Sequence, residues 1–211
     1  MCPRSVRNFK PLKEMQILID AILPFADVRV GQPHRSFYYT ENGVNIIYLV
    51  LVGTIFIHRS SDGMVVATGY SPLIVGLTNE ILMGEADYFF TTETDISYAV
   101  TPLHNAKDII RDNNLWKDYS IFQSYLLKYI SINSAKNTAL SAYEVIRNQL
   151  INLMHEPDEI RLSITAAQYI QERTRLSRSG IMKILSQLKI GGYITTSEGK
   201  LMDMIKLPVN F

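Results

Sequence analysis

The chain has 211 residues, enough for one large domain or two modest domains that each bury a core. Hydrophobic residues make up 47% and charged residues 19%, a globular composition that excludes a disordered chain. The longest apolar run, 46–57, contains Tyr, Gly and Thr and is too short for a membrane span, so we expect buried strands there. The N-terminal sequence lacks the pattern of a signal peptide, so we expect none. Cys2 is the single cysteine, so we also expect no internal disulfide. Together these expectations predict a cytoplasmic protein with no membrane partner.

The net charge of +1 hides an asymmetry along the chain. Residues 1–159 carry 13 Lys and Arg against 17 Asp and Glu, a net charge of −4. Residues 160–211 carry 8 against 3, a net charge of +5. A basic C-terminal segment on an acidic chain indicates a polyanionic partner for that segment, or a chance surplus on a solvated surface.

The first half of the chain predicts one helix followed by many short strands. Apolar residues recur at helical spacing over 12–23 and stop at Pro24. Turn signals such as Ser61-Asp62-Gly63 then separate short β runs as far as Val100. Short strands at this spacing favour an antiparallel sandwich or barrel. The expected strands are Ser36–Thr40, Ile46–Leu51, Thr54–His58, Met64–Tyr70, Tyr88–Thr92 and Ile96–Val100.

From Pro102 onward the apolar period becomes helical. We expect a short helix over 103–111 and a long helix from about 115. The long helix carries a heptad-like stripe, which favours dimerisation of two copies of the chain. The alternative is that the stripe covers the β domain of its own subunit. The residues of this predicted stripe are Leu115, Tyr119, Phe122, Leu126 and Tyr129.

A helix over about 140–154 precedes a helix-turn-helix pattern. Thr165 is a natural N-cap for a helix that contains Ala166–Ile170, and Ser177 caps a second helix, Arg178–Ile190. Gly191-Gly192 ends that helix, and strand, turn and strand follow as a wing. The buried stripe of the second helix is expected to be Ile181, Ile184, Leu185 and Leu188.

The opposite face of the second helix predicts a contact surface for duplex DNA. It carries Arg178, Ser179, Met182, Lys183 and Gln187. Arg178 fits a bidentate contact to guanine and Ser179 a contact to a base edge, while Ser177, Lys183 and Lys200 suit phosphates. Two alternatives stay open: a winged helix that contacts protein within a ligand- or protein-binding module, and an incidental basic surface.

These features resemble the cAMP-receptor/FNR superfamily of transcription regulators over nearly the whole chain. The resemblance rests on Ile47–Gly53 before a hairpin, on Ser177-Arg178 and on Ile184–Leu188. The stretch Tyr169–Ser179 is similar to one branch, that of the inhibitor of hydrogen peroxide resistance. The resemblance implies a cyclic-nucleotide-binding-like β-roll, control of peroxide-stress genes, and DNA, a second copy of the chain and RNA polymerase as partners. The implied α+β domains are a sensor-like β-roll at 1–112, a dimerisation helix at 113–137 and a winged helix-turn-helix at 138–211.

The departures from the family pattern predict a degenerate sensor. Members that bind cyclic nucleotides pair Gly-Glu with a following Arg-Ser, whereas Leu77 follows Gly76 here. A Gly84-Glu85 pair occurs, but no arginine lies between Arg59 and Arg111. Because a buried cyclic phosphate needs a cationic partner, we expect no cyclic nucleotide. With one cysteine an iron–sulfur cluster is excluded, and the usual turn glycine is absent near Thr174.

The remaining polar and aromatic residues predict neither catalysis nor a cofactor. The four histidines lie far apart in the sequence, so we expect no metal site. No phosphate loop and no Gly-x-Ser-x-Gly elbow occurs, so we expect no enzyme. Cys2 beside Arg4 is a minor candidate for redox sensing. The aromatic residues favour a sandwich core over a ligand cage: Tyr38, Tyr39, Tyr48, Tyr70, Tyr88, Phe89 and Phe90.

Overall fold

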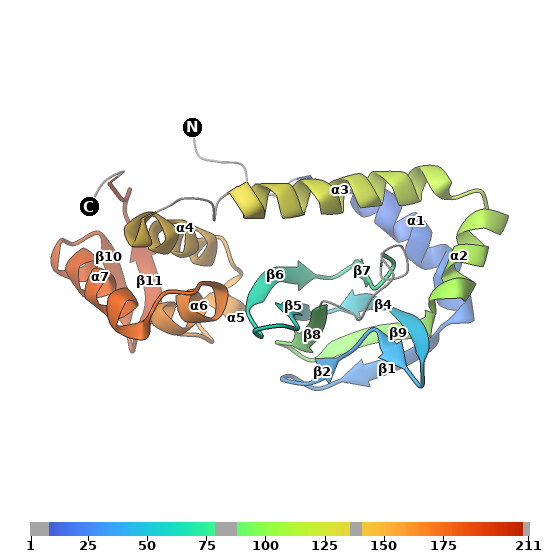
Figure 1. The fold of residues 1–211 in the computed structure, drawn as a ribbon, viewed down its shortest axis with the longest axis horizontal. Helices are drawn as coiled ribbons and strands as arrows, with labels where there is room; N and C mark the ends of the chain where they lie inside the picture. The colour runs from blue at the N-terminus through green and yellow to red at the C-terminus, as the bar shows by residue number, and fades with distance from the viewer. Residues whose placement is uncertain (1–8, 79–87, 136–140, 209–211) are drawn as a thin grey trace. The chain divides into compact units, whose positions relative to one another are not determined.

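The computed structural model describes residues 9–78, 88–135 and 141–208 and has the expected α+β class (Figure 1). The Gly84-Glu85 pair and Cys2, both singled out in the sequence, lie outside these residues. The chain divides into two compact units, one ending at Tyr129 and one beginning at Ile130.

The first unit contains two antiparallel sheets. One sheet has the strand order β1-β9-β4-β3, with β7 paired to β4, and the other has the order β2-β8-β5-β6. The β5–β6 hairpin forms at the predicted Ser61–Gly63 turn, where Gly63 has a φ of 69°. Strands β1 and β7 were not predicted, and the predicted strand Ser36–Thr40 is divided between β2 and β3. The strand bounds are β1 Asp27–Gly31, β2 Ser36–Phe37, β3 Thr40–Glu41, β4 Val44–Val52, β5 Thr54–Arg59, β6 Val65–Tyr70, β7 Leu73–Val75, β8 Tyr88–Thr92 and β9 Ile96–Pro102.

Aromatic rings from both sheets fill the interior of the roll. Phe37 of β2 stacks on Phe90 of β8 with ring centroids 4.9 Å apart. Tyr48 of β4 meets Phe90 edge-on at 5.0 Å, and Tyr98 of β9 meets Phe37 edge-on at 5.2 Å. Tyr39 is buried in the same cluster. The prediction that Tyr39, Tyr48 and Phe90 belong to the core is therefore confirmed.

Two of the aromatic residues predicted for the core are exposed instead, Tyr38 and Tyr88. Successive side chains of an extended chain point to opposite sides, so Tyr38 points away from its neighbours, the half-buried Phe37 and the buried Tyr39. Its ring stacks on Phe89, which in turn stacks on His58. The prediction was wrong for Tyr38 because alternation places it on the outer face.

Three helices complete the first unit. Buried residues of α1, among them Met15, Leu18 and Ile19, join the same hydrophobic core as Leu103 and Ala106 of α2. This packing buries the apolar stripe that the sequence predicted over 12–23. The helices of this unit are α1 Leu12–Ile22, a 3-10 turn Leu23–Phe25, α2 Leu103–Asp112 and α3 Trp116–Ala135, which continues into the second unit.

The second unit packs four helices against a two-stranded hairpin. Its core is formed by apolar residues from every long element, including Leu150, Ile170, Leu188 and Leu201. Helix α4 begins with a capping box, in which Ser141 accepts from the Glu144 amide and Glu144 accepts from the Ser141 amide. The bounds are α4 Ala142–Met154, α5 Asp158–Arg161, α6 Ala166–Arg173, α7 Arg178–Ile190, β10 Ile194–Ser197 and β11 Lys200–Met204.

Candidate nucleic-acid interface

Helices α6 and α7 are capped by the side chains that the sequence predicted. The Thr165 hydroxyl accepts from the amide of Gln168 at 3.2 Å and begins α6. The Ser177 hydroxyl accepts from the amide of Gly180 at 3.2 Å and begins α7. Each cap satisfies an amide that the first helical turn would leave without an acceptor. The bounds of α7 coincide with the predicted range.

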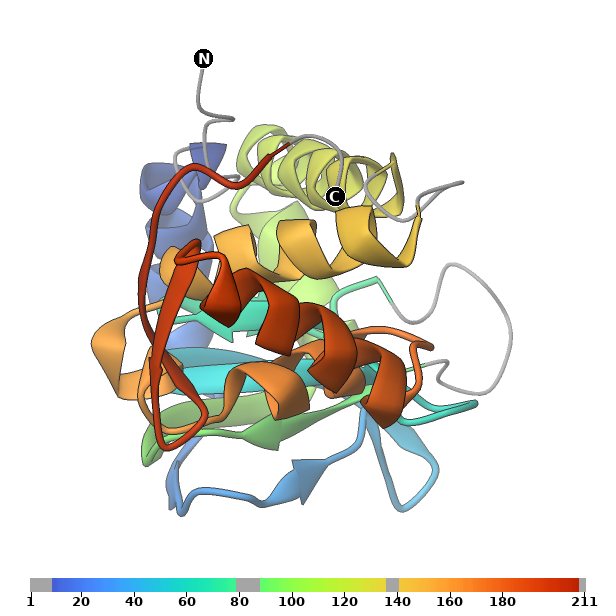
Figure 2. The ribbon, with the colours of Figure 1, turned by 90° about the vertical axis from the view of Figure 1, so that its left-hand side faces the viewer.

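Helix α7 separates an apolar side from a polar side. Ile181, Leu185 and Leu188 are buried, and Ile184 is half-buried. Figure 2 shows α7 running across the front of the second unit. The predicted DNA-contacting side chains of the helix are all exposed: Ser177, Arg178, Ser179, Lys183 and Gln187. Lys200, at the start of β11, is half-buried. The fold therefore leaves a row of donors accessible along one side of the helix.

Ser177 has a second role besides the phosphate contact predicted for it. Its hydroxyl oxygen is already an acceptor for the helix cap and lies 3.3 Å from the Ser179 hydroxyl. A hydroxyl retains one donor when it accepts, so a phosphate contact is compatible with the cap. A Cβ on Gly180 would lie 3.2 Å from the Ser177 oxygen, so glycine leaves this helix start uncrowded.

The wing is held tightly to the rest of the unit. Glu198 and Gly199 have φ values of 50° and 78°, which is the two-residue turn typical of tight hairpins. The Gly199 carbonyl accepts a hydrogen bond from the amide of Ala166 at 2.9 Å. The Arg161 guanidinium donates to the carbonyls of Leu201 and Met202 at 2.9 and 2.8 Å. The hairpin is thus fixed both at its turn and along β11.

The basic surplus of this segment divides into structural and surface cations. Arg161 is only 14% exposed and also pairs with Asp158 at 2.8 Å. Arg173 is buried, with its guanidinium 3.7 Å from the centroid of the Tyr169 ring. The charge count of the sequence included both. The other cations of the segment are exposed or half-buried, namely Arg175, Arg178, Lys183, Lys189, Lys200 and Lys206.

Comparisons with known proteins agree with this geometry. Residues 142–209 match the family described as winged helix-turn-helix DNA binding. The chain is 27% identical over 164 residues to the inhibitor of hydrogen peroxide resistance of Escherichia coli K12, covering 78% of this chain and 79% of that protein. The Salmonella typhimurium protein of the same name is 27% identical over 165 residues, with the same coverage.

Solved structures extend the likeness to the whole fold. The c-di-GMP responsive global regulator CLP of Xanthomonas campestris superposes with a TM-score of 0.76 at 15% identity, covering 90% of this chain and all of that chain. A CRP/FNR-family transcriptional regulator of Thermus thermophilus has a TM-score of 0.62 at 16% identity, covering 84% and 94%. The chain has the Crp/Fnr regulator fold. The predicted fold class and resemblance are confirmed.

The long helix α3 turns most of the predicted stripe toward its own roll. Phe122 is fully buried in the core of the first unit, and Leu115, Tyr119 and Leu126 pack against the same core. Tyr129 lies beside Tyr125, with ring centroids 6.2 Å apart. Four of the five stripe residues thus pack against their own roll, which is the alternative that the sequence left open, and Phe122 is closed to a partner in this conformation.

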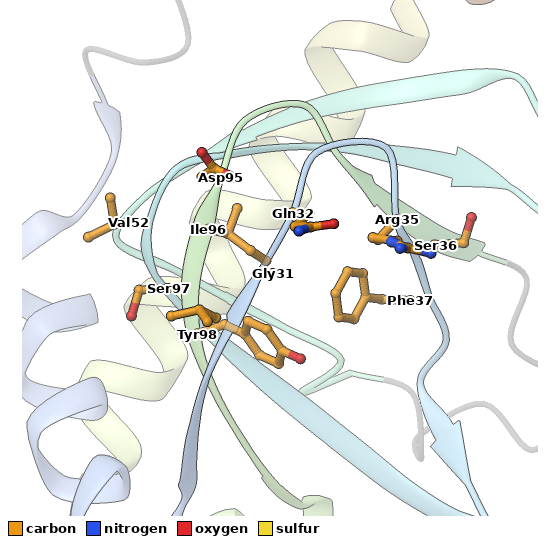
Figure 3. Close-up of a pocket in the computed structure, with 11 residues that line it drawn as sticks. Gly31, Gln32, Arg35, Ser36, Phe37, Val52, Asp95, Ile96, Ser97 and Tyr98 are labelled. Atoms are coloured by element: carbon orange, nitrogen blue, oxygen red, sulfur yellow. The ribbon is translucent and has the colours of Figure 1, made fainter.

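A cavity of about 810 Å³ opens at one end of the roll. Figure 3 shows Arg35 on one side of it and Asp95 on the other, with the rings of Phe37 and Tyr98 nearby. Arg35 was not among the cations predicted for the roll, because the expected position of a cation lay between Arg59 and Arg111. No local signal identifies it, because the turn before β2 reaches β9 only through the fold.

The sequence also led us to expect no metal site and no membrane-spanning helix. Within the described ranges, no three His, Cys, Asp or Glu side chains gather closely enough to hold a metal ion. Among the helices of those same ranges, none is long and apolar enough to cross a bilayer.

Proposed function

We propose that this Crp/Fnr-type chain is a cytoplasmic transcription regulator that binds specific duplex DNA through α7. The supporting observation is the exposed row that begins with Arg178 and Ser179 and continues to Lys183 and Gln187, on a helix whose opposite side packs into the core of the unit. No acidic residue occurs between Arg173 and Ser197. The face therefore carries donors without a carboxylate to repel the phosphates.

Binding of labelled duplexes by the full chain at several salt concentrations tests this proposal. Arg178→Ala is expected to cost about 1–3 kcal/mol on the preferred sequence and to relax specificity at one base pair. Lys189→Ala is the matched control, since this exposed cation sits in the last turn of the same helix. Equal effects of the two variants would refute the contact assignment. Binding without steep salt dependence would refute the DNA partner itself.

We also propose a homodimer formed by the outer face of α3. Trp116 and Leu127 are exposed there and lie 11 residues apart, which is about three helical turns and hence one side of the helix. Ser120 and Ser124 lie exposed between them and bond back to their own helix. Leu127→Glu is expected to convert dimer to monomer in sedimentation, and Lys117→Glu, at the start of the same helix, is not.

We propose further that the roll is a sensor domain that does not bind cyclic nucleotides. The aromatic cluster of Phe37, Tyr48, Phe90 and Tyr98 occupies the space between the sheets. No arginine occurs between Gly76 and Arg111, where the family pattern would place its Arg-Ser pair, and Arg35 of the cavity comes from another part of the chain. Calorimetric titration of the full chain with cyclic AMP is expected to give no heat of binding. A saturable heat would refute the proposal.

A role in hydrogen peroxide stress is proposed from the relatives, whose name is inhibitor of hydrogen peroxide resistance. Deletion of the gene in its own host is expected to change survival under peroxide, and the intact gene to reverse that change. An Arg178→Ala gene that restores the original survival would show that the phenotype does not depend on DNA recognition.

Protein contact through the winged helix is the second candidate function. Ile190 is 84% exposed at the end of α7, and Ile205 is exposed just after β11. Apolar side chains of this size at a surface are available to a protein partner, and we propose RNA polymerase as that partner. Ile190→Ser is expected to reduce transcription activation in vitro and to leave DNA affinity unchanged. Retained activation would remove this candidate.

A further inference from the structure

One side chain on the DNA-facing side of α7 is apolar. Met182 is 49% exposed and lies one turn beyond Arg178, next to Lys183. The buried positions of the helix are already filled by Ile181, Leu185 and Leu188. Met182 therefore makes no contribution to the core that could explain an apolar residue at this position, and its thioether chain projects among the donors.

The major groove offers one apolar group for such a side chain. Each base pair presents donors and acceptors there, and thymine alone adds a C5-methyl group. Four residues along an α-helix advance about 6 Å, and successive base pairs are about 3.4 Å apart. A contact by Met182 therefore falls one or two base pairs from the base that Arg178 reaches.

The absence of acidic residues along α7 further limits which bases the helix can recognise. Glutamate and aspartate are the side chains that accept from the amino group of cytosine. The sequence has none from Arg173 to Ser197, so α7 offers no carboxylate to a cytosine. Besides Ser179, Lys183 and Gln187, the helix presents a guanidinium suited to guanine and an apolar chain suited to thymine.

We propose that Met182 is a specificity-determining residue that contacts the methyl group of a thymine, one or two base pairs from a guanine contacted by Arg178. The inference rests on the proposed DNA binding of α7 and specifies the base pair that this face selects. Arg178 supplies the hydrogen bonds to guanine, and Met182 supplies the apolar contact to thymine.

Selection by the intact chain from a pool of randomised duplexes supplies the site for the test. Each thymine of the selected site is then replaced singly by deoxyuridine, which lacks only the methyl group. Burial of one methyl group predicts about three- to fivefold weaker binding at one thymine per half-site. Met182→Ala is expected to abolish this sensitivity, and Met182→Leu to retain it. Met202→Ala removes an exposed methionine of the wing and is the control that keeps the sensitivity.

Two results would overturn the proposal. In one, no thymine responds to deoxyuridine although the chain selects a defined site. In the other, the responding thymine responds equally in Met182→Ala. A chain that selects no site at all refutes the proposed function of α7 as well, so the two failures are distinguishable.

Discussion

The amide of Ala166, the first residue of α6, donates a 2.9 Å hydrogen bond to the carbonyl of Gly199 in the turn of the wing. The two residues are 33 positions apart, yet this bond satisfies an orphan amide at a helix start with an orphan carbonyl at a hairpin turn. This hydrogen bond therefore fixes the position of the wing relative to α6, the first helix of the motif.

Substitution of Gly199 by alanine is expected to destabilise the C-terminal unit by about 2 kcal/mol. The φ of 78° costs a side chain about 1 kcal/mol or more, and a Cβ would lie 3.2 Å from Cγ2 of Thr165. Gly192→Ala is the matched control, since its φ is 70° but nothing lies within 4 Å of a Cβ. Urea unfolding measures both variants. Equal losses would show that the contact with Thr165 contributes nothing.

Replacement of Arg161 by alanine is expected to cost about 2 kcal/mol of unfolding free energy. It removes two charge-assisted hydrogen bonds to the carbonyls of Leu201 and Met202. Asp158→Ala removes only the ion pair, and the Asp158 side chain is 77% exposed, so a loss below about 1 kcal/mol is expected. Thermal unfolding compares the two. A loss for Asp158→Ala as large as that for Arg161→Ala would contradict this reading of Arg161.

Glu198→Lys is expected to strengthen DNA binding. Glu198 is exposed at the wing turn, two residues before Lys200, where a carboxylate opposes approach of a phosphate. Reversal of its charge adds a phosphate contact and steepens the salt dependence by about one unit. Glu159→Lys makes the same charge change in α5 and is the control. Anisotropy titrations at several salt concentrations decide, and an equal gain for both variants indicates a non-specific charge effect.

Alkaline pH is expected to destabilise the roll through Tyr48. Burial, followed by the nearby Glu41 carboxylate, raises the pKa of Tyr48 to about 12. A raised pKa means that the folded state favours the protonated phenol, so this contribution to stability is complete below pH 10 and is lost as the pH rises toward 12. The phenol also donates to the carbonyl of Tyr38 at 2.8 Å.

Tyr48→Phe tests that expectation, because it keeps the ring and removes the ionisable group. Unfolding free energies measured between about pH 9 and pH 11 should fall less steeply in the variant than in the parent chain. At neutral pH the variant should lose about 1 kcal/mol for the missing hydrogen bond. Parallel pH profiles would assign the alkaline transition to other groups.

Local signals predicted the C-terminal unit well. The caps Thr165 and Ser177 and the glycines after Ile190 fix where helices begin and end, because each acts on its own backbone within one turn. In the structure it is Gly192, with a φ of 70°, and not Gly191 that adopts the left-handed conformation. Such boundaries depend on neighbouring residues alone, so they are readable from the sequence.

Long-range placement accounts for what the sequence did not predict. The stripe through Phe122 has a clear period, but a period does not say which surface the stripe meets. Arg35 reaches the cavity, and Arg161 reaches the wing, only after segments distant in the chain are brought together. The short strand Leu73–Val75 was missed for the same reason, since it is defined by its pairing with β4.

The stacking of Arg173 on Tyr169 has a practical consequence for experiments on this chain. An alanine scan of every cation from position 161 onward would record Arg173 as essential to operator affinity, although its guanidinium is enclosed by protein. The loss would report a collapsed domain, and circular dichroism of each variant separates that outcome from a missing phosphate ligand. The cations of this segment therefore fall into two groups, those that stabilise the fold and those that are exposed to the proposed DNA partner. A loss of binding in a variant does not by itself distinguish the two groups.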